Sequence, residues 1–319
     1  MDDFTKIYGQ DLAIEILRST ISKEQISPAY LFSGPEGVGK KETAKVFIKA
    51  ILDKKFNKET TKRKIESNNH PDLLWIEPSY ILQGKSISKK KAKSENIIIK
   101  SPAKIRLTDI KKIIEFLSKK PLESKKSIVI IEDIETMNES ASNALLKTLE
   151  EPKTGLFILI TQRPEKLLST IRSRCQIVPF IRLQNKQVNK IIQRLEVDQE
   201  RHDVNSEKIE ALIAFSYGAP GRYLTNLKNW LGISSELRQK LENKPTNEIE
   251  VLKLAKDITD ELNIEEQLWL ISFQQNIMWE QETNSIMINR LEELRKQLLT
   301  YEQPRLAWEV SLLEMYFFN

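Results

Sequence analysis

The sequence predicts an α/β domain followed by helical pieces, and three observations support this prediction. In the first half of the 319-residue chain, short β-branched runs alternate with stretches of helical periodicity, which is typical of a parallel sheet covered by helices. A glycine-rich loop lies between the first of these runs and the next helical stretch. After about Phe180 the strand patterns end and long amphipathic stretches follow. We therefore expect an α/β domain over residues 1–182 and helical domains over residues 183–242 and 243–319.

The α/β half should contain five strands and four helices. The strands are expected at Ala29 to Ser33, Asp72 to Ile76, Ser127 to Ile131, Phe157 to Ile160 and Gln176 to Phe180. Apolar side chains at helical spacing predict the buried faces of three helices: Leu12, Ile16 and Thr20; Ala44, Phe47, Ile48 and Ile51; and Leu107, Ile110, Ile114 and Leu117. A fourth helix should begin with a capping box from Thr136 to Glu139, bury Ala141, Leu145 and Leu149 with Met137, and end before Pro152.

The helical half is interrupted at two places, Gly218 to Gly221 and the linker-like stretch from Asn243 to Asn247. Pro304 should begin a final helix. The expected buried face of that helix consists of Leu306, Val310, Leu313 and Phe317. Four of the five tryptophans lie in this half, and buried helix packing is the favoured interpretation, with a subunit interface as the alternative.

Composition excludes several classes of protein. With 40% hydrophobic and 30% charged residues, no apolar run near the ~20 residues of a membrane helix and an acidic start, we expect a soluble, cytoplasmic protein. One cysteine and two histidines exclude a disulfide and a Cys/His zinc site. The net charge of +5 permits an acidic partner without requiring one. The lysine-rich stretches Lys54 to Lys64 and Lys85 to Lys93 are expected to be exposed loops that are open to non-specific phosphate contact.

The strongest local motif runs from Gly34 to Lys41, directly after a predicted strand and before a predicted helix. Gly34, Gly37 and Gly39 let backbone N–H groups surround a phosphate, and Lys40 can reach its terminal groups. Lys41, however, stands where a Ser or Thr hydroxyl would ligate Mg²⁺.

An acidic pair, Glu132 and Asp133, follows the buried run that ends at Ile131. In a P-loop enzyme one such carboxylate belongs to the metal shell and the other orients the attacking water. The two residue types stand here in reversed order, and the shorter Asp133 misplaces its carboxylate by more than about an ångström, which argues against efficient hydrolysis.

Arg174 lies in the segment Ile171 to Cys175, after a predicted strand and the polar Thr161. Such an arginine has two interpretations, a surface salt bridge or an arginine finger that reaches a neighbouring subunit's nucleotide. The sequence alone favours the salt bridge.

Four segments together resemble bacterial sliding-clamp loader subunits of the AAA+ superfamily. They are Gly34 to Lys41, Glu132-Asp133, Asn143 to Pro152 and Ser173 to Cys175. Within that group the chain most resembles the delta-prime family of DNA polymerase III, which His70-Pro71-Asp72 and Ile105-Arg106 also resemble. The resemblance is detailed from about Phe4 to Phe180 and thinner through Asn319.

The resemblance implies an AAA+ P-loop sheet domain, a small helical lid over 183–242 and a helical collar over 243–319 that packs in a ring with sister subunits. It implies other clamp-loader subunits, the sliding clamp and primed DNA as partners, and no membrane. By position, the resemblance assigns the P-loop lysine to Lys40, the acidic pair to Glu132 and Asp133, sensor one to Thr161 and an arginine finger donated in trans to Arg174. Because of this resemblance, the arginine finger becomes the favoured interpretation of Arg174 and the surface salt bridge becomes the alternative.

Three departures from the family pattern limit this transfer. Many clamp-loader subunits carry a four-cysteine zinc module, but the corresponding stretch from Asn57 to Asn69 has no cysteine, so no zinc is expected. Arg222 lies one residue away from the sensor-two arginine of active relatives. Lys41 removes the magnesium hydroxyl, which fits a stator better than a motor.

We therefore expect a delta-prime-type stator, a non-polymerising component of a DNA-directed DNA polymerase whose own ATPase is absent or weak. Passive binding of ATP or ADP by the loop stays open. Two alternatives also stay open, namely an ATP-hydrolysing motor subunit and a non-catalytic DNA-binding scaffold that uses Lys85 to Lys93.

Overall fold

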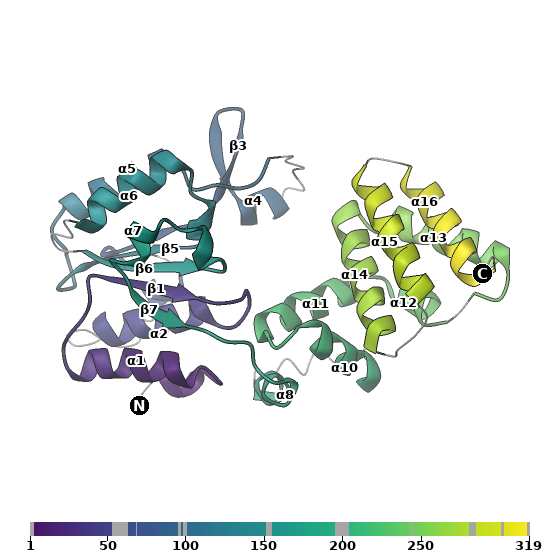
Figure 1. Ribbon diagram of the computed structural model, residues 1–319, viewed down its shortest axis with the longest axis horizontal. Helices are drawn as coiled ribbons and strands as arrows, with labels where there is room; N and C mark the ends of the chain where they lie inside the picture. The colour runs from purple at the N-terminus through teal and green to yellow at the C-terminus, as the bar shows by residue number, and fades with distance from the viewer. Residues whose placement is uncertain are drawn as a thin grey trace. The chain divides into compact units, whose positions relative to one another are not determined.

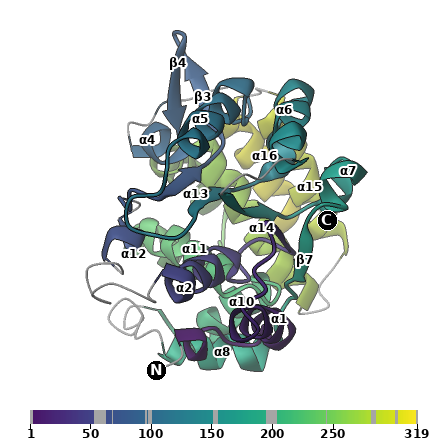
Figure 2. The same cartoon turned by 90° about the vertical axis from the view of Figure 1, so that its left-hand side faces the viewer.

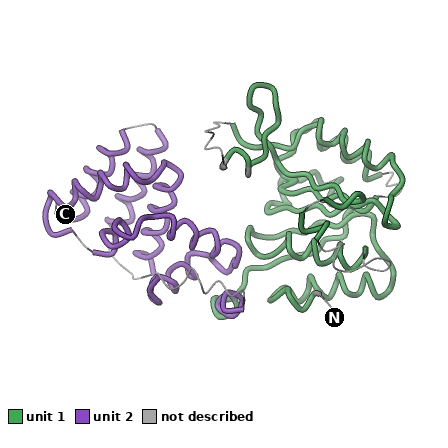
Figure 3. The backbone as a smooth tube through the Cα atoms, turned by 180° about the vertical axis from the view of Figure 1, so that it is seen from behind, with its two compact units in different colours: residues 1–187 green, residues 188–319 purple. Residues whose placement is uncertain are grey.

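The chain forms two compact units in the computed structural model, residues 1–187 and residues 188–319 (Figure 3). The structure describes residues 3–52, 63–67, 69–94, 97, 101–150, 155–194, 204–243, 245–280, 285–300 and 303–317. The boundary between the units falls within helix α8 (Asn185–Arg194). The finer boundary expected between residues 242 and 243 stays a prediction.

The first unit is built on a five-stranded sheet in the order β2-β5-β6-β1-β7, and every pairing in it is parallel. Its strands are β1 (Ala29–Ser33), β2 (Leu73–Ile76), β5 (Ser127–Ile131), β6 (Gly155–Thr161) and β7 (Gln176–Pro179). Both β5 and β6 are buried along their whole length, which is why they read as continuous apolar runs. The predicted α/β architecture and its five strands are confirmed.

Helices cover both faces of the sheet (Figure 1). One face carries α5 (Leu107–Ser118), α6 (Glu139–Glu150) and α7 (Ser169–Arg172), and the other carries α1 (Asp11–Ser22) and α2 (Lys40–Leu52). Short 3-10 turns lie at η1 (Asp3–Lys6), η2 (Ile134–Thr136) and η3 (Pro164–Lys166). On the α2 face, the Tyr30 and Phe47 rings meet edge to face with centroids 5.1 Å apart.

Two of the expected helix faces are wrong in part. Leu12 is 57% exposed, whereas Ala13 and Leu17 are fully buried. In α5, Ile114 is 47% exposed and the neighbouring Ile113 is buried. Where apolar residues stand at adjacent positions, the periodicity allows two faces about 100° apart, and the neighbouring strands decide between them.

The expected capping box at α6 is also wrong. Asn138 caps the helix, because its Oδ1 accepts the Ala141 N–H at 3.0 Å. The Thr136 hydroxyl instead donates to the Asp133 carbonyl at 2.8 Å, within η2. The buried residues of α6 are Ala141, Leu145 and Leu149, as predicted, and Met137 packs against the same core. Pro152 lies outside the described residues.

A β-hairpin with a short helix after it replaces one of the two expected loops (Figure 2). The hairpin consists of β3 (Ser79–Leu82) and β4 (Lys85–Ser88), followed by α4 (Lys89–Ser94). Gln83 and Gly84 form its turn with φ of 48° and 76°, the left-handed pair that matches the twist of a two-residue hairpin. Of the other lysine-rich stretch, residues 54–62 lie outside the described residues.

The second unit is helical throughout its described residues, as predicted. Besides α8 it contains α10 (Ser206–Phe215), α11 (Pro220–Gly232), α12 (Ser235–Glu242), α13 (Glu248–Glu261), α14 (Ile264–Glu280), α15 (Ser285–Leu299) and α16 (Pro304–Tyr316). The first break lies at residues 216–219, two residues earlier than expected, because Pro220 and Gly221 already belong to the first turn of α11. The second break, between Glu242 and Glu248, and the start of the last helix at Pro304 match the prediction. None of the described helices combines the length and the apolar character needed to cross a membrane.

Aromatic side chains form part of the core of the second unit. Phe273 contacts the rings of Phe215, Trp230 and Trp269 at centroid distances of 5.4–5.7 Å. Trp279 does not share this burial, since it is 71% exposed. The expected buried face of α16 is wrong as well, because Leu306 and Val310 are 56% and 43% exposed. The buried residues there are Ala307, Trp308, Ser311, Leu312 and Met315.

Candidate functional site

The predicted nucleotide loop, the acidic pair and Thr161 lie at one edge of the sheet. The loop follows β1, the acidic pair follows β5, and Thr161 ends β6. Since β1, β5 and β6 are parallel neighbours in the order β5-β6-β1, their carboxyl ends meet there. The structure therefore brings these three parts of the predicted site together.

Glycine is required in the loop for two separate reasons. Gly34, Gly37 and Gly39 have φ of 152°, 76° and 98°, values that residues with a side chain rarely adopt. Gly34 is also packed against the chain after β7, where a Cβ would lie 2.3 Å from the Phe180 carbonyl oxygen. The loop is thus closely fitted to β7 as well as sharply turned.

Gln10 anchors this arrangement, although it is not among the predicted site residues. Its side chain is buried, and its Oε1 accepts the Ile181 N–H at 3.0 Å. Its Nε2 donates to the carbonyls of Ile181 at 2.9 Å and Val38 at 3.3 Å. One amide therefore ties the loop to the segment after β7, and no local motif around Gln10 signals that contact.

Lys40 points into its own loop. Its side chain is buried, and its ammonium group donates to the carbonyls of Gly34 and Pro35. Burial lowers the pKa of Lys40 to about 8, against the opposing effect of nearby carboxylates such as Glu135 and Asp133. The lysine is held at the loop where a phosphate group would lie.

Lys41 forms an ion pair with the first carboxylate of the acidic pair. Its ammonium group contacts Oε2 of Glu132, while Glu77 lies 3.8 Å away. Glu132 is only 4% exposed, and its Oε1 accepts a hydrogen bond from the Trp75 indole. Burial raises the pKa of Glu132, and Lys41 and Trp75 offset part of that rise.

Asp133, the second carboxylate, is paired with another lysine. Lys89, the first residue of α4, lies 3.1 Å from its Oδ2, and Gln162 donates to its Oδ1 at 3.3 Å. Asp133 adopts a left-handed φ of 44°, which is uncommon for a residue other than glycine. Lys89 is not among the predicted site residues, because its lysine-rich surroundings resemble a solvated loop.

Thr161 bonds to Glu135, two residues beyond the acidic pair. Its hydroxyl donates to the Glu135 carboxylate at 2.8 Å and accepts the Arg163 N–H at 3.0 Å. The same carboxylate accepts the Gln162 N–H at 3.0 Å. Glu135 therefore holds the end of β6, a role that its position after two other acidic residues concealed.

The residues present at this edge do not fit a magnesium ion of the P-loop type. Such an ion needs a hydroxyl from the first turn of α2 and a free carboxylate after β5. Lys41 supplies no oxygen, and its ammonium group already contacts Glu132. The Thr43 hydroxyl, two residues further on, donates back to the Gly39 carbonyl at 2.9 Å. The described residues of this edge therefore lack the free hydroxyl and the free carboxylate that such an ion needs.

Arg174 lies beyond α7 and forms a salt bridge within the chain. Its guanidinium group contacts Glu150 at 2.8 Å and the Thr170 carbonyl at 3.1 Å. Both partners of the salt bridge are well exposed, at 38% and 45% of their side-chain area. Arg222 belongs to the second unit, where its guanidinium lies over the rings of Phe215 and Tyr217 at 5.9 and 5.4 Å.

Comparison with known proteins agrees with this architecture. The family model described as "DNA polymerase III, delta subunit" matches residues 9–184, more than half of the chain. The chain belongs to this family. A second model, "Cyanobacterial DNA polymerase III delta prime, C-terminal domain", matches residues 186–315.

Curated relatives are also DNA polymerase III subunits. The delta' subunit of Bacillus subtilis is 36% identical over 185 residues, 56% of this chain and 50% of the relative. The tau subunit of the same organism is 28% identical over 269 residues, 81% of this chain and 43% of the relative. The chain therefore aligns with about half of the length of these relatives or less. The fold is shared with a gamma subunit-related protein of Thermotoga maritima, at a TM-score of 0.53 and 18% identity over 94% of this chain and 97% of that one.

Two motifs that resemble those of this DNA polymerase III family, His70-Pro71-Asp72 and Ile105-Arg106, join distant segments of the first unit. Asp72 accepts the N–H groups of Leu122, Glu123 and Ser124 at 2.6–2.7 Å. Burial by itself would raise the pKa of Asp72, but these hydrogen bonds outweigh it and lower the pKa. Burial lowers the pKa of His70 despite the opposing effect of the nearby Glu123 carboxylate.

Arg106 belongs to the second of these motifs, and it joins the hairpin to α5. Its guanidinium donates to the Ser79 carbonyl at 2.8 Å and the Lys104 carbonyl at 3.1 Å. Its backbone N–H donates to the Asp109 carboxylate at 3.1 Å, at the start of α5. Arg106 therefore stabilises the base of the element that carries Lys89.

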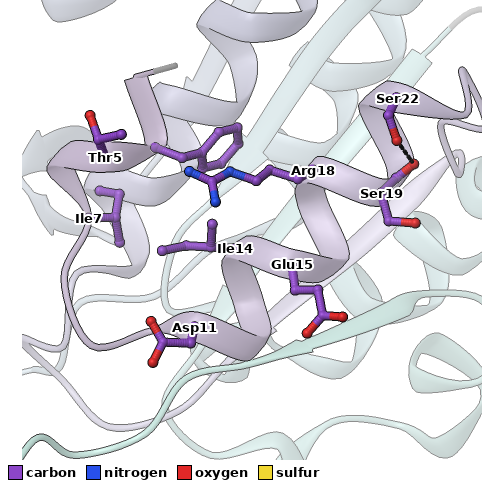
Figure 4. Close-up of a pocket in the computed structure, with 9 residues that line it drawn as sticks. Thr5, Ile7, Asp11, Ile14, Glu15, Arg18, Ser19 and Ser22 are labelled. Carbon is purple, nitrogen blue, oxygen red and sulfur yellow. Dashed lines mark hydrogen bonds between the residues drawn. The ribbon is translucent and has the colours of Figure 1, made fainter. Parts of the chain in front are cut away.

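A shallow pocket between η1 and α1 contains none of the predicted site residues (Figure 4). The Arg18 guanidinium lies within it, 5.9 Å from the centre of the Phe4 ring. The other lining residues are Thr5, Ile7, Asp11, Ile14, Glu15, Ser19 and Ser22. Nothing in this pocket resembles a phosphate or metal site.

Proposed function

We propose that this chain is a delta-prime-type subunit of the DNA polymerase III clamp loader. It joins a heteromeric AAA+ ring with other loader subunits and helps to place the sliding clamp on primed DNA in replication. Membership of the DNA polymerase III delta family and the delta' relative in Bacillus subtilis support this proposal. In such a ring, residues 183–242 form the lid and residues 243–319 form the collar that contacts the neighbouring subunits.

Within that ring the chain acts as a stator, a subunit that does not turn over ATP. One observation carries this part of the proposal, namely that both carboxylates of the acidic pair are already paired with lysines. Lys41 contacts Glu132 and Lys89 contacts Asp133. A carboxylate in such a pair is poorly placed to hold a metal or to orient a water molecule.

The chain's catalytic contribution is Arg174, donated in trans as an arginine finger to an adjacent subunit's ATP. An exposed salt bridge is worth about 0–1 kcal/mol, so the guanidinium can exchange Glu150 for a phosphate at little cost. A finger of this kind contributes about 10³–10⁵ to turnover in other nucleotide hydrolases. Arg174 supplies charge at the transition state, and the neighbouring subunit supplies the rest of the site.

The deciding experiment measures ATP turnover by the reconstituted loader with clamp and primed DNA. Arg174→Ala should lower turnover at least tenfold, which is about 1.4 kcal/mol of transition-state stabilisation. Arg172→Ala, in the same exposed segment, is the matched control and should leave turnover within about twofold. Native mass spectrometry first checks that all three loaders assemble equally. Unchanged turnover with Arg174→Ala would make Arg174 a structural residue and remove the trans finger.

The motor alternative has a test of its own on the isolated chain. It requires measurable ATP hydrolysis that Lys40→Ala abolishes. We expect no hydrolysis above background with either form, because neither acidic residue is free of a lysine partner.

A further inference from the structure

The ammonium group of Lys41 lies where P-loop proteins hold their metal. The metal of such proteins is bound between the first helical turn after the loop and the carboxylate that follows the neighbouring buried strand. Here α2 begins at Lys40, and the ammonium group of Lys41 reaches Glu132, directly after β5. The Lys41 ammonium group thus lies between α2 and the end of β5, where such proteins bind their metal.

Three features hold that charge in place. Glu132 is 4% exposed and accepts the Trp75 indole N–H on its other oxygen, so its carboxylate cannot turn toward water. Glu77 adds a second negative charge 3.8 Å from Lys41. Leaving Glu132 buried without a cation costs far more than an exposed pair is worth. Although the Lys41 side chain is 53% exposed, its ammonium group is therefore held at the buried Glu132 carboxylate.

The β3–β4 hairpin delivers a second lysine to the same place. Lys89 follows β4 directly and lies 3.1 Å from Asp133, while Arg106 fastens the base of the hairpin through the Ser79 carbonyl. The acidic pair is therefore neutralised from two directions, by the helix after the loop and by the inserted hairpin.

We propose that Lys41 and Lys89 replace the divalent metal of this site, so that the loop binds a nucleoside diphosphate without metal. The phosphate ligands that remain are the backbone N–H groups of the glycine turns, the N-terminus of α2 and the ammonium group of Lys40. A diphosphate is the better ligand, because a metal is needed chiefly to bridge and neutralise the β- and γ-phosphates of a triphosphate.

Nucleotide binding by the full isolated chain tests this proposal, with ADP as the probe. Isothermal titration is run in excess MgCl₂ and again in EDTA. For the wild-type chain the two dissociation constants should agree within about twofold. In the double variant Lys41→Thr/Lys89→Ala, a hydroxyl stands at the metal-ligand position and both carboxylates are released, so ADP should bind at least about tenfold tighter with Mg²⁺ than in EDTA. Lys45→Ala removes an α2 lysine that pairs with Glu42 instead, and it should remain indifferent to Mg²⁺.

Three results would overturn the proposal. Tighter ADP binding by the wild-type chain in Mg²⁺ would mean that the lysines do not replace the metal. If ADP bound in neither medium, Lys41 and Lys89 would close the loop to phosphate instead of replacing the metal. A double variant that stays indifferent to Mg²⁺ would show that another feature excludes the metal.

A second measurement needs no variant, in case the double variant fails to fold. Electron paramagnetic resonance of Mn²⁺, added with ADP to the wild-type chain, should show no protein-bound ion beyond the ADP complex in buffer. A bound Mn²⁺ signal would contradict the proposal. Because both measurements use the isolated chain, their failure is distinct from a failure of the Arg174 finger, which is measured in the assembled loader.

Discussion

Cations pair with carboxylates both at the loop edge, where Lys41 contacts Glu132, and at the Arg174 corner, where Arg174 contacts Glu150, but the two places differ in the burial of the carboxylate. At the loop edge, Glu132 is 4% exposed and bonds to both Lys41 and Trp75. At the corner, the side chains of Arg174 and Glu150 are 38% and 45% exposed. A buried carboxylate cannot lose its partner cheaply, whereas an exposed pair exchanges with water or with a ligand. Glu132 therefore keeps its partners, whereas the exposed pair of Arg174 and Glu150 is free to exchange.

The largest expected effect concerns the close packing of the loop edge. Gly34→Ala places a Cβ 2.3 Å from the Phe180 carbonyl and also strains the backbone, so the first unit should lose more than about 3 kcal/mol. In Gly39→Ala a Cβ meets nothing within 4 Å, and only the strain of its φ of 98° remains, about 1–2 kcal/mol. Hydrogen exchange of the β5 and β6 amides measures unfolding of this unit. Equal losses in the two variants would mean that the contact with Phe180 can relax.

Asp72→Asn should have the next largest effect, about 2–3 kcal/mol at neutral pH, because a neutral amide replaces a carboxylate that accepts three backbone N–H groups. The folded state lowers the pKa of Asp72 below its ordinary value of 3.8. The stability that it contributes is present above that value and is lost as pH falls through the folded pKa. The gap between wild type and variant should therefore narrow below about pH 4 in the same exchange measurement. A gap that is independent of pH would assign the effect to the shape of the side chain instead of its charge.

Lys41→Met tests the pair between the buried Glu132 and the half-exposed Lys41 and should cost about 1–3 kcal/mol, because the Glu132 carboxylate is left without its cation. Burial raises the pKa of Glu132, so the folded protein favours the protonated carboxyl group. The stability that comes from this protonated form is fully present below the ordinary pKa of glutamate and is lost as the pH rises through the folded pKa. Without Lys41 the pKa should rise further, and the variant should be less destabilised at pH 5 than at pH 8. Lys45→Met, one turn further along the same helix, removes a lysine that pairs with the exposed Glu42 instead; it is the control and should stay within about 0.5 kcal/mol at both pH values.

Glu150→Gln at the Arg174 corner should have the smallest effect on stability, less than about 1 kcal/mol. The amide removes the charge of Glu150 and keeps the length of the side chain. Urea unfolding, monitored through hydrogen exchange of the β5 and β6 amides, measures this difference in stability. A loss above about 2 kcal/mol would remove the contrast with the loop edge and would identify the salt bridge as a structural element.

Much of the first unit could be predicted from the sequence. Its parallel strands are buried on both faces, so β5 and β6 appear as uninterrupted apolar runs of ordinary strand length. The phosphate loop could be recognised in the sequence because the φ values that it needs exclude almost every residue other than glycine. Carboxyl ends of neighbouring parallel strands share an edge, so the loop, the acidic pair and Thr161 could be placed together before the fold was known.

Other features could not be predicted, because their causes are non-local. The hairpin turn at Gln83 and Gly84 lacks the usual Asn-Gly or Asp-Gly pair, and the lysines of β4 and α4 concealed a strand. Adjacent apolar residues in α1 and α5 left two possible faces, and packing against the sheet selected Leu17 over Leu12. In α16, neighbours in the second unit selected the face of Trp308 over that of Leu306.

The sequence by itself determined the α/β class of the first unit, the helical class of the second and the position of the phosphate loop, because these follow from periodicity and from the limits of the backbone. Only the tertiary structure decided which charges meet. Lys89 lies 44 residues from Asp133 along the chain, and Gln10 lies 171 residues from Ile181, yet each pair is in contact. Pairings over such separations depend on the order of strands in the sheet and on where an inserted hairpin folds back, and no local pattern encodes either of them.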